Sequence, residues 1–143
     1  MSAKINSIFI VAGEPSGDVH AEKLVSALKA ISPKTKFFGN GGDKMAESGV
    51  EIIHHINDMS VMGFVEVIKH YPKLLNIFEN TISMIKKIKP DKIILVDYPG
   101  FNLRLAKKIK KLKLGIPITY FILPQLWAWK ESRIKIMKKT IDQ

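Results

Sequence analysis

The most constraining feature of this chain is an apolar run that leads through a glycine-bounded turn into a helical pattern. Residues 7–11 have the length and composition of a buried strand. Gly13 and Gly17 bound the turn, and apolar residues recur at helical spacing directly after it. This order is typical of the first β–α unit of a parallel sheet that carries helices on both faces.

The turn differs from a dinucleotide-binding fingerprint. Such a site places three glycines in G-x-G-x-x-G, so that bare backbone N–H groups face a pyrophosphate. Here two glycines bound the turn, and Glu14 and Asp18 bring two carboxylates to a helix N-terminus. Carboxylates repel phosphate and accept hydrogen bonds from hydroxyl and amide groups. The turn therefore favours a sugar-like ligand over a nucleotide phosphate.

Apolar spacing predicts that strands and helices alternate along the whole chain. We expect strands over residues 7–11, 36–38, 50–53, 92–96 and 118–122, and helices over about 16–31, 43–48, 73–88, 101–112 and 131–139. Crossovers between parallel strands are nearly always right-handed. The predicted fold class is therefore α/β, a Rossmann-like three-layer arrangement around a parallel sheet. A chain of 143 residues is long enough for one such domain.

Asp97 directly follows residues 92–96, the most uniformly apolar strand candidate. In open α/β sheets, ligands bind outside the carboxyl ends of the strands. An acid at that position is a candidate for catalysis on placement alone. The alternative is that its carboxylate caps the helix that begins near residue 101.

Residues 58–71 carry apolar side chains on every side of any helix drawn through them, so not all of these side chains can face one core. One interpretation is burial between two elements. The other is a patch that contacts membrane or an acyl chain, with Lys69, His70 and Lys73 beside it to meet anionic head groups. The apolar residues concerned are Met59, Val61, Met62, Phe64 and Val65.

Two indoles, Trp127 and Trp129, follow the last predicted strand on a loop at the ligand-binding end of the sheet. Aromatic rings in such a loop stack on sugars or anchor a surface in lipid, and packing against the preceding helix is the alternative. We group both tryptophans with the apolar patch as candidates for contact with membrane or acyl chains.

The formal net charge is +10, from 23 basic and 13 acidic residues. This excess favours an anionic partner, such as a lipid surface, a phosphorylated ligand or nucleic acid, and solvated helix faces are the plain alternative. Charge alone predicts no specific nucleic-acid binding.

The absence of cysteine excludes thiol chemistry and disulfides. The neighbours His54 and His55 would point to opposite faces of a strand, so they are not expected to chelate one metal ion.

Five separated motifs, in order, resemble the N-terminal half of the lipid-A-disaccharide synthase family. They are Gly-Glu-Pro-Ser-Gly-Asp at 13–18 with His20, Gly41-Gly42 with Met45 and Gly49, Val-Met-Gly at 61–63 with Glu66-Val67, Asp-Tyr-Pro-Gly-Phe-Asn at 97–102, and Pro124-Gln125 with Trp-Ala-Trp at 127–129 and Arg133. The resemblance implies an inverting glycosyltransferase of the two-domain GT-B type. Residues 1–143 would be part of its N-terminal, acceptor-side domain.

The resemblance also implies a reaction. UDP-2,3-diacylglucosamine would be joined to 2,3-diacylglucosamine 1-phosphate, giving the β-1,6-linked disaccharide 1-phosphate and UDP. Asp97 would be the carboxylate that assists the acceptor hydroxyl, and neither a metal nor another cofactor is expected. The enzyme would be cytoplasmic and peripheral on the inner face of the inner membrane. Residues expected to shape the acceptor site are Glu14, Ser16, Asp18, Asn102 and, as a weaker member, His20.

Two departures from the family pattern matter. Gly100 stands where the family's Asp-x-Pro-Asp-Phe-Asn motif has a second acid. The sugar-nucleotide domain is expected to be absent from these 143 residues, so they alone are not expected to catalyse transfer. The rival interpretation is a non-catalytic α/β module that binds a membrane surface or a partner. A second rival, a nucleotide-binding Rossmann domain, is disfavoured by the missing third glycine and by Glu14 and Asp18.

Overall fold

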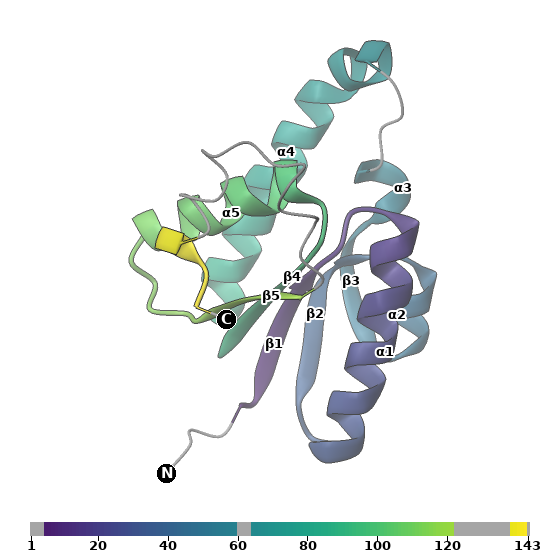
Figure 1. Ribbon diagram of the computed structural model, residues 1–143, viewed down its shortest axis with the longest axis vertical. Helices are drawn as coiled ribbons and strands as arrows, with labels where there is room; N and C mark the ends of the chain where they lie inside the picture. The colour runs from purple at the N-terminus through teal and green to yellow at the C-terminus, as the bar shows by residue number, and fades with distance from the viewer. Residues whose placement is uncertain (1–4, 60–63, 122–137, 143) are drawn as a thin grey trace.

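The computed structural model describes residues 5–59, 64–121 and 138–142 (Figure 1). Their framework is a five-stranded sheet in which all neighbouring strands run parallel, in the order β3-β2-β1-β4-β5. The strands are β1 (Ser7–Val11), β2 (Lys36–Gly41), β3 (Val50–His55), β4 (Lys92–Val96) and β5 (Ile118–Phe121). The predicted α/β class with a parallel sheet is confirmed.

Helices cover both faces of the sheet, which gives three layers (Figure 1). Helices α1 and α2 lie on one face, and α4 and α5 lie on the other. The bounds are α1 (Pro15–Ile31), α2 (Asp43–Glu47), α3 (Ile56–Met59), α4 (Phe64–Ile88) and α5 (Pro99–Lys111). None of the helices in the described ranges is both long and apolar enough to cross a membrane.

Alternation along the central strands builds two separate cores. On β1, Phe9 and Val11 join the core beneath α4 and α5, whereas Ile8 and Ile10 join the core beneath α1 and α2. Successive side chains of a strand point to opposite faces, so a strand buried on both sides must be apolar at every position. This requirement explains why β1 and β4 are continuous apolar runs.

The strand order reverses between β1 and β4, which are neighbours although two strands separate them in the sequence. The chain first builds the sheet outward from β1 to β3, and then returns to the other side of β1 to add β4 and β5. Ligands of doubly wound sheets bind at such a switch point, outside the carboxyl ends of the strands. The segments after β1 and β4 therefore define the candidate site.

Several predicted boundaries were wrong, among them the end of β3, which reaches His55 rather than residue 53. Helix α4 begins at Phe64 and contains Pro72, although we expected the helix to start after that proline. A proline removes one backbone hydrogen bond, and here packing of the apolar stripe that follows it outweighs the loss. Helix α5 begins at Pro99, because proline suits the first helical position. Strand β2 reaches Gly41, beyond the predicted end at residue 38. Of the last predicted helix, 131–139, residues 131–137 lie outside the described residues.

Candidate functional site

The segments that follow β1 and β4 lie side by side at the carboxyl end of the sheet. The register pairs Val11 with Leu95, so both chains leave the sheet at the same level. A Cβ atom on Gly13 would lie 2.4 Å from Cδ2 of Tyr98. Glycine is therefore required at position 13, because the aromatic ring of the second segment packs directly on the backbone of the first.

Asp97 and Tyr98 form a left-handed turn after β4. Their φ angles are +46° and +51°, which is unusual for two consecutive residues other than glycine. Each such residue costs on the order of 1 kcal/mol, so the turn must be held by its surroundings. The N-cap residue of α5 is Tyr98 and no side chain caps it, so the capping role considered for Asp97 is wrong.

Asn102 supports this turn from inside the protein. Its side chain is 0% exposed, and its amide nitrogen lies 2.8 Å from the carbonyl oxygen of Asp97. The same nitrogen lies 3.3 Å from the carbonyl oxygens of Val11 and Val96. Only the NH₂ side of an amide can donate to carbonyls, which fixes its orientation. Asn102 thus ties β1 to β4, and its burial argues against direct contact with a ligand.

Asp18 is also a buried support. Its side chain is 4% exposed, and its carboxylate accepts the backbone N–H groups of Gly42 at 2.8 Å, Met45 at 3.0 Å and Lys44 at 3.1 Å. These donors belong to the N-terminus of α2, which carries unsatisfied N–H groups and a partial positive charge. Both carboxylate oxygens are therefore engaged in joining α1 to α2, and Asp18 lies beneath the surface that a ligand would reach.

Glu14, Ser16 and His20 are exposed at the same end of the sheet. Glu14 is the N-cap residue of α1, and its carbonyl oxygen accepts the N–H of Asp18 at 3.0 Å. Ser16 and His20 are four residues apart on α1, so they lie on one face of the helix. These three side chains are therefore open to solvent, unlike Asp18 and Asn102.

A cavity of about 660 Å³ lies beside this cluster, between α4 and α5. Phe78 and Phe101 meet there edge to face, with ring centroids 5.4 Å apart. Leu75 is 45% exposed on the same wall. The described residues that line the cavity are Glu14, Leu74, Leu75, Phe78, Tyr98, Pro99, Gly100, Phe101 and Arg104. Asp97 is not among them. Sequence reasoning missed this cavity, because its walls come from two helices whose contact no local pattern encodes.

A family model described as lipid-A-disaccharide synthetase matches residues 8–143. The chain belongs to this family. It is 46% identical over 136 residues to the lipid-A-disaccharide synthase of Myxococcus xanthus, covering 95% of this chain and 35% of that protein. The enzymes of Trichlorobacter lovleyi and Coxiella burnetii are 44% and 39% identical over 94% and 95% of this chain. The chain spans about a third of the length of these relatives.

Tyr98 has the clearest electrostatic perturbation at the site of this synthase-family chain. Burial raises the pKa of its phenol, and the nearby negative charge of Glu14 raises it further. The hydroxyl donates a hydrogen bond to the carbonyl oxygen of Met59 at 2.7 Å. The phenol therefore stays protonated and neutral at ordinary pH.

The apolar patch predicted from the pattern of residues 58–71 is corrected at one position. Met59 ends α3 with 0% exposure and belongs to the core, so it is not a surface contact for lipid. Val61, Met62, Trp127 and Trp129 lie outside the described residues. Helix α4 contains residues 64 and 65, and the side chains of Phe64 and Val65 also lie outside what is described.

Gly100, the position where this chain departs from the family motif, has open space around it. A Cβ atom built there meets no atom within 4 Å, and the residue lines the 660 Å³ cavity. The backbone therefore accommodates an acidic side chain at this position.

Neither histidine of the pair at the end of β3 is placed as a metal ligand. His54 Nε2 lies 2.7 Å from Asn80 Oδ1, and His55 Nε2 lies 2.9 Å from Asp43 Oδ1. Within residues 5–59, 64–121 and 138–142, no group of three potential His, Cys, Asp or Glu ligands is found.

Proposed function

We propose that this chain is the acceptor-binding part of a lipid-A-disaccharide synthase. The complete enzyme would transfer a diacylglucosamine unit from its UDP derivative to 2,3-diacylglucosamine 1-phosphate, with release of UDP. Family membership over residues 8–143 supports the activity. The single structural observation that carries the assignment of the site is the position of Asp97, at the switch point and beside the turn that follows β1.

In the proposed mechanism, Asp97 is the general base. Its carboxylate takes the proton of the acceptor 6-hydroxyl as that oxygen attacks the anomeric carbon of the donor. The bond from this carbon to the diphosphate breaks, UDP leaves with the electron pair, and the configuration inverts. A base in this role must come within about 3 Å of the hydroxyl oxygen. Asp97 is partly exposed at the carboxyl end of β4, in keeping with this requirement.

The neighbouring polar residues divide into two groups in this proposal. The exposed group, Glu14, Ser16 and His20, offers acceptors and donors to the hydroxyl and amide groups of the acceptor sugar. The buried group, Asp18 and Asn102, holds the segments that carry them. The apolar cavity between α4 and α5 then receives an acyl chain of the lipid, since its volume and aromatic walls suit an apolar ligand.

Association with the inner face of the inner membrane is part of the same proposal. The net charge of +10 favours binding to anionic lipid head groups. The other proposed partners are the sugar-nucleotide donor and the remaining two-thirds of the enzyme. The second domain would supply most contacts to UDP.

The decisive experiment joins this chain to the remaining two-thirds of the Myxococcus xanthus relative. We expect the fusion to release UDP when both diacyl sugars are present, and we expect residues 1–143 alone to release none. Omitting the lipid acceptor is the control for simple donor hydrolysis. A fusion that unfolds cooperatively, and so is folded, but releases no UDP would contradict the proposal and favour a non-catalytic binding module.

A further inference from the structure

We propose that Tyr120, acting together with Asn102, is a positioning residue that sets the direction of the Asp97 carboxylate. This inference rests on the proposed function, in which Asp97 is the base. It assigns a role to a side chain on the neighbouring strand that no sequence motif marks.

Two buried donors converge on one oxygen atom. The Tyr120 hydroxyl donates to the carbonyl oxygen of Asp97 at 2.6 Å, and the Asn102 amide donates to the same oxygen at 2.8 Å. Tyr120 is 6% exposed and Asn102 is 0% exposed, so neither bond competes with much solvent. A carbonyl with two lone pairs is satisfied fully by this pair. The two bonds fix the peptide group that joins Asp97 to Tyr98.

That peptide group determines where the Asp97 side chain points. Along β4, Leu95 joins the core beneath α4 and α5, and Val96 joins the core beneath α1 and α2. A strand continued through position 97 would return the next side chain to the face covered by α4 and α5. The left-handed φ of +46° breaks this alternation. Because the conformation is intrinsically costly, it persists only while surrounding contacts hold it.

The hydroxyl of Tyr120 is separable from its ring. The ring belongs to the core beneath α4 and α5, and the residue pairs with Leu95 in the sheet. Phenylalanine would fill the same core volume and lose the bond to Asp97. Tyr120→Phe is therefore a test of the hydrogen bond that leaves the fold in place.

The experiment uses the fusion described above and measures kcat and KM separately. Tyr120→Phe should lower kcat about tenfold, since small misplacements of a catalytic group have effects of this order, while KM stays within about twofold. In the Asp97→Asn background, the same change should lower the residual rate no further, because the two residues act as one unit. Thr35→Val is the matched control. It removes the hydroxyl group that bonds to the carbonyl oxygen of Ile5 at 3.1 Å and to Ser32 Oγ at 2.8 Å, at the other end of the sheet, and kcat should not change.

The outcomes separate the two proposals. An unchanged kcat for Tyr120→Phe, with Asp97→Asn inactive, would overturn the positioning role and leave the proposed function standing. Additive losses in the double variant would also overturn it. If the unmodified fusion has no activity, a crystal structure of the Tyr120→Phe chain decides the point. Loss of the left-handed turn at Asp97 supports the inference, and an unchanged turn refutes it.

Discussion

Asp91 precedes β4 and Asp97 follows it, so a single strand separates two chemically identical side chains. The Asp91 carboxylate accepts the backbone N–H groups of Asn6 at 2.8 Å and Ser7 at 3.1 Å, and so anchors the start of β1. Asp97 is held instead through its main chain, because its carbonyl oxygen receives the bonds from Tyr120 and Asn102. The Asp91 carboxylate is therefore structural, whereas these two bonds hold the backbone of Asp97 without using its carboxylate, which supports its proposed role as the base.

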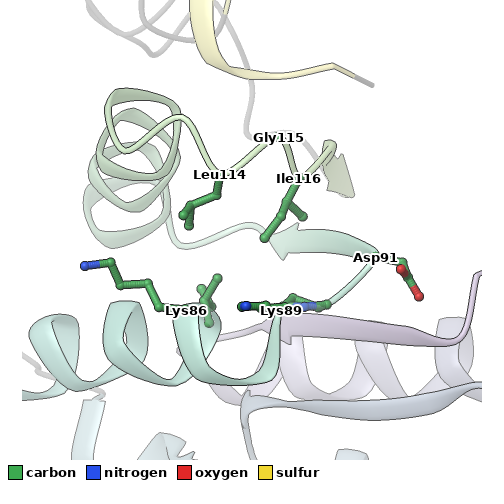
Figure 2. Close-up of a pocket in the computed structure, with 8 residues that line it drawn as sticks. Lys86, Lys89, Asp91, Leu114, Gly115 and Ile116 are labelled. Carbon is green, nitrogen blue, oxygen red and sulfur yellow. The ribbon is translucent and has the colours of Figure 1, made fainter.

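The cavities at the two ends of the sheet also differ, in volume and in the residues that line them. Figure 2 shows the cavity of about 320 Å³ at the amino end, where Leu114 and Ile116 point toward α4 and Asp91 turns away. Lysines 86 and 89 flank it. The cavity at the carboxyl end is about twice as large and has aromatic walls. Size, apolar lining and adjacent polar side chains support the proposed ligand site at the carboxyl end.

Exchanging the two acids for amides should give the largest contrast. In the fusion enzyme, Asp97→Asn should lower kcat by about 10²- to 10⁴-fold, the usual contribution of a general base, with little change in Tm. Asp91→Asn should leave kcat unchanged and lower the free energy of unfolding by about 1–2 kcal/mol, because two backbone donors lose a charged acceptor. UDP release and urea denaturation measure the two effects. The opposite pattern would reverse the assignment of the two ends.

Gly100 at the carboxyl end and Gly115 at the amino end differ in backbone conformation, and this difference can be tested. A Cβ at either Gly100, in α5, or Gly115, before β5, meets no atom within 4 Å, but Gly115 has a φ of +72°. Gly100→Ala should stabilise the protein by about 0.5–1 kcal/mol through helix propensity. Gly115→Ala should destabilise it by about 1 kcal/mol through backbone strain. Thermal unfolding of both variants checks the prediction, and equal shifts in Tm would show that φ does not control the difference.

Much of this arrangement was predictable because it follows from local pattern. Apolar runs identified β1 and β4, and the rule for parallel sheets placed Asp97 at the same end as the turn after β1. The roles of Asp18 and Asn102 were not predictable in this way. Asp18 bonds to Gly42, 24 positions away, and Asn102 bonds to Val11, 91 positions away. Their residue types indicate that each side chain forms hydrogen bonds. Only the packed fold shows that the partners are backbone groups rather than a ligand.

Alkaline pH should weaken the carboxyl end selectively through Tyr98. Burial and Glu14 raise the pKa of its phenol in the folded protein, so the unfolded chain loses this proton first, near pH 10. Stability due to the protonated phenol is fully present below that pH and is lost as pH rises through the folded pKa. Tyr98→Phe should therefore be less stable than the unmodified protein at pH 8, and the gap in Tm should narrow as pH rises above 10. A constant gap would count against this effect.

The amino end should show the reverse dependence, with a smaller amplitude, through Asp142. The backbone N–H of Ile118 donates to its carboxylate at 2.7 Å, and this bond, with help from Lys110 at 3.0 Å, lowers the pKa of Asp142. The resulting stability is present above the unfolded pKa near 4 and is lost as pH falls through the folded value. Because the side chain is 42% exposed, solvent screening holds the effect below about 1 kcal/mol.

Comparing the Tm of Asp142→Asn with that of the unmodified chain at pH 5 and pH 2 tests this pH dependence. The difference should be smaller at pH 2 than at pH 5, and 1 M salt should reduce it at pH 5, since salt screens the lysine but leaves the backbone bond intact. A difference that is as large at pH 2 as at pH 5 would mean that the amide itself, rather than the loss of charge, disturbs the start of β5.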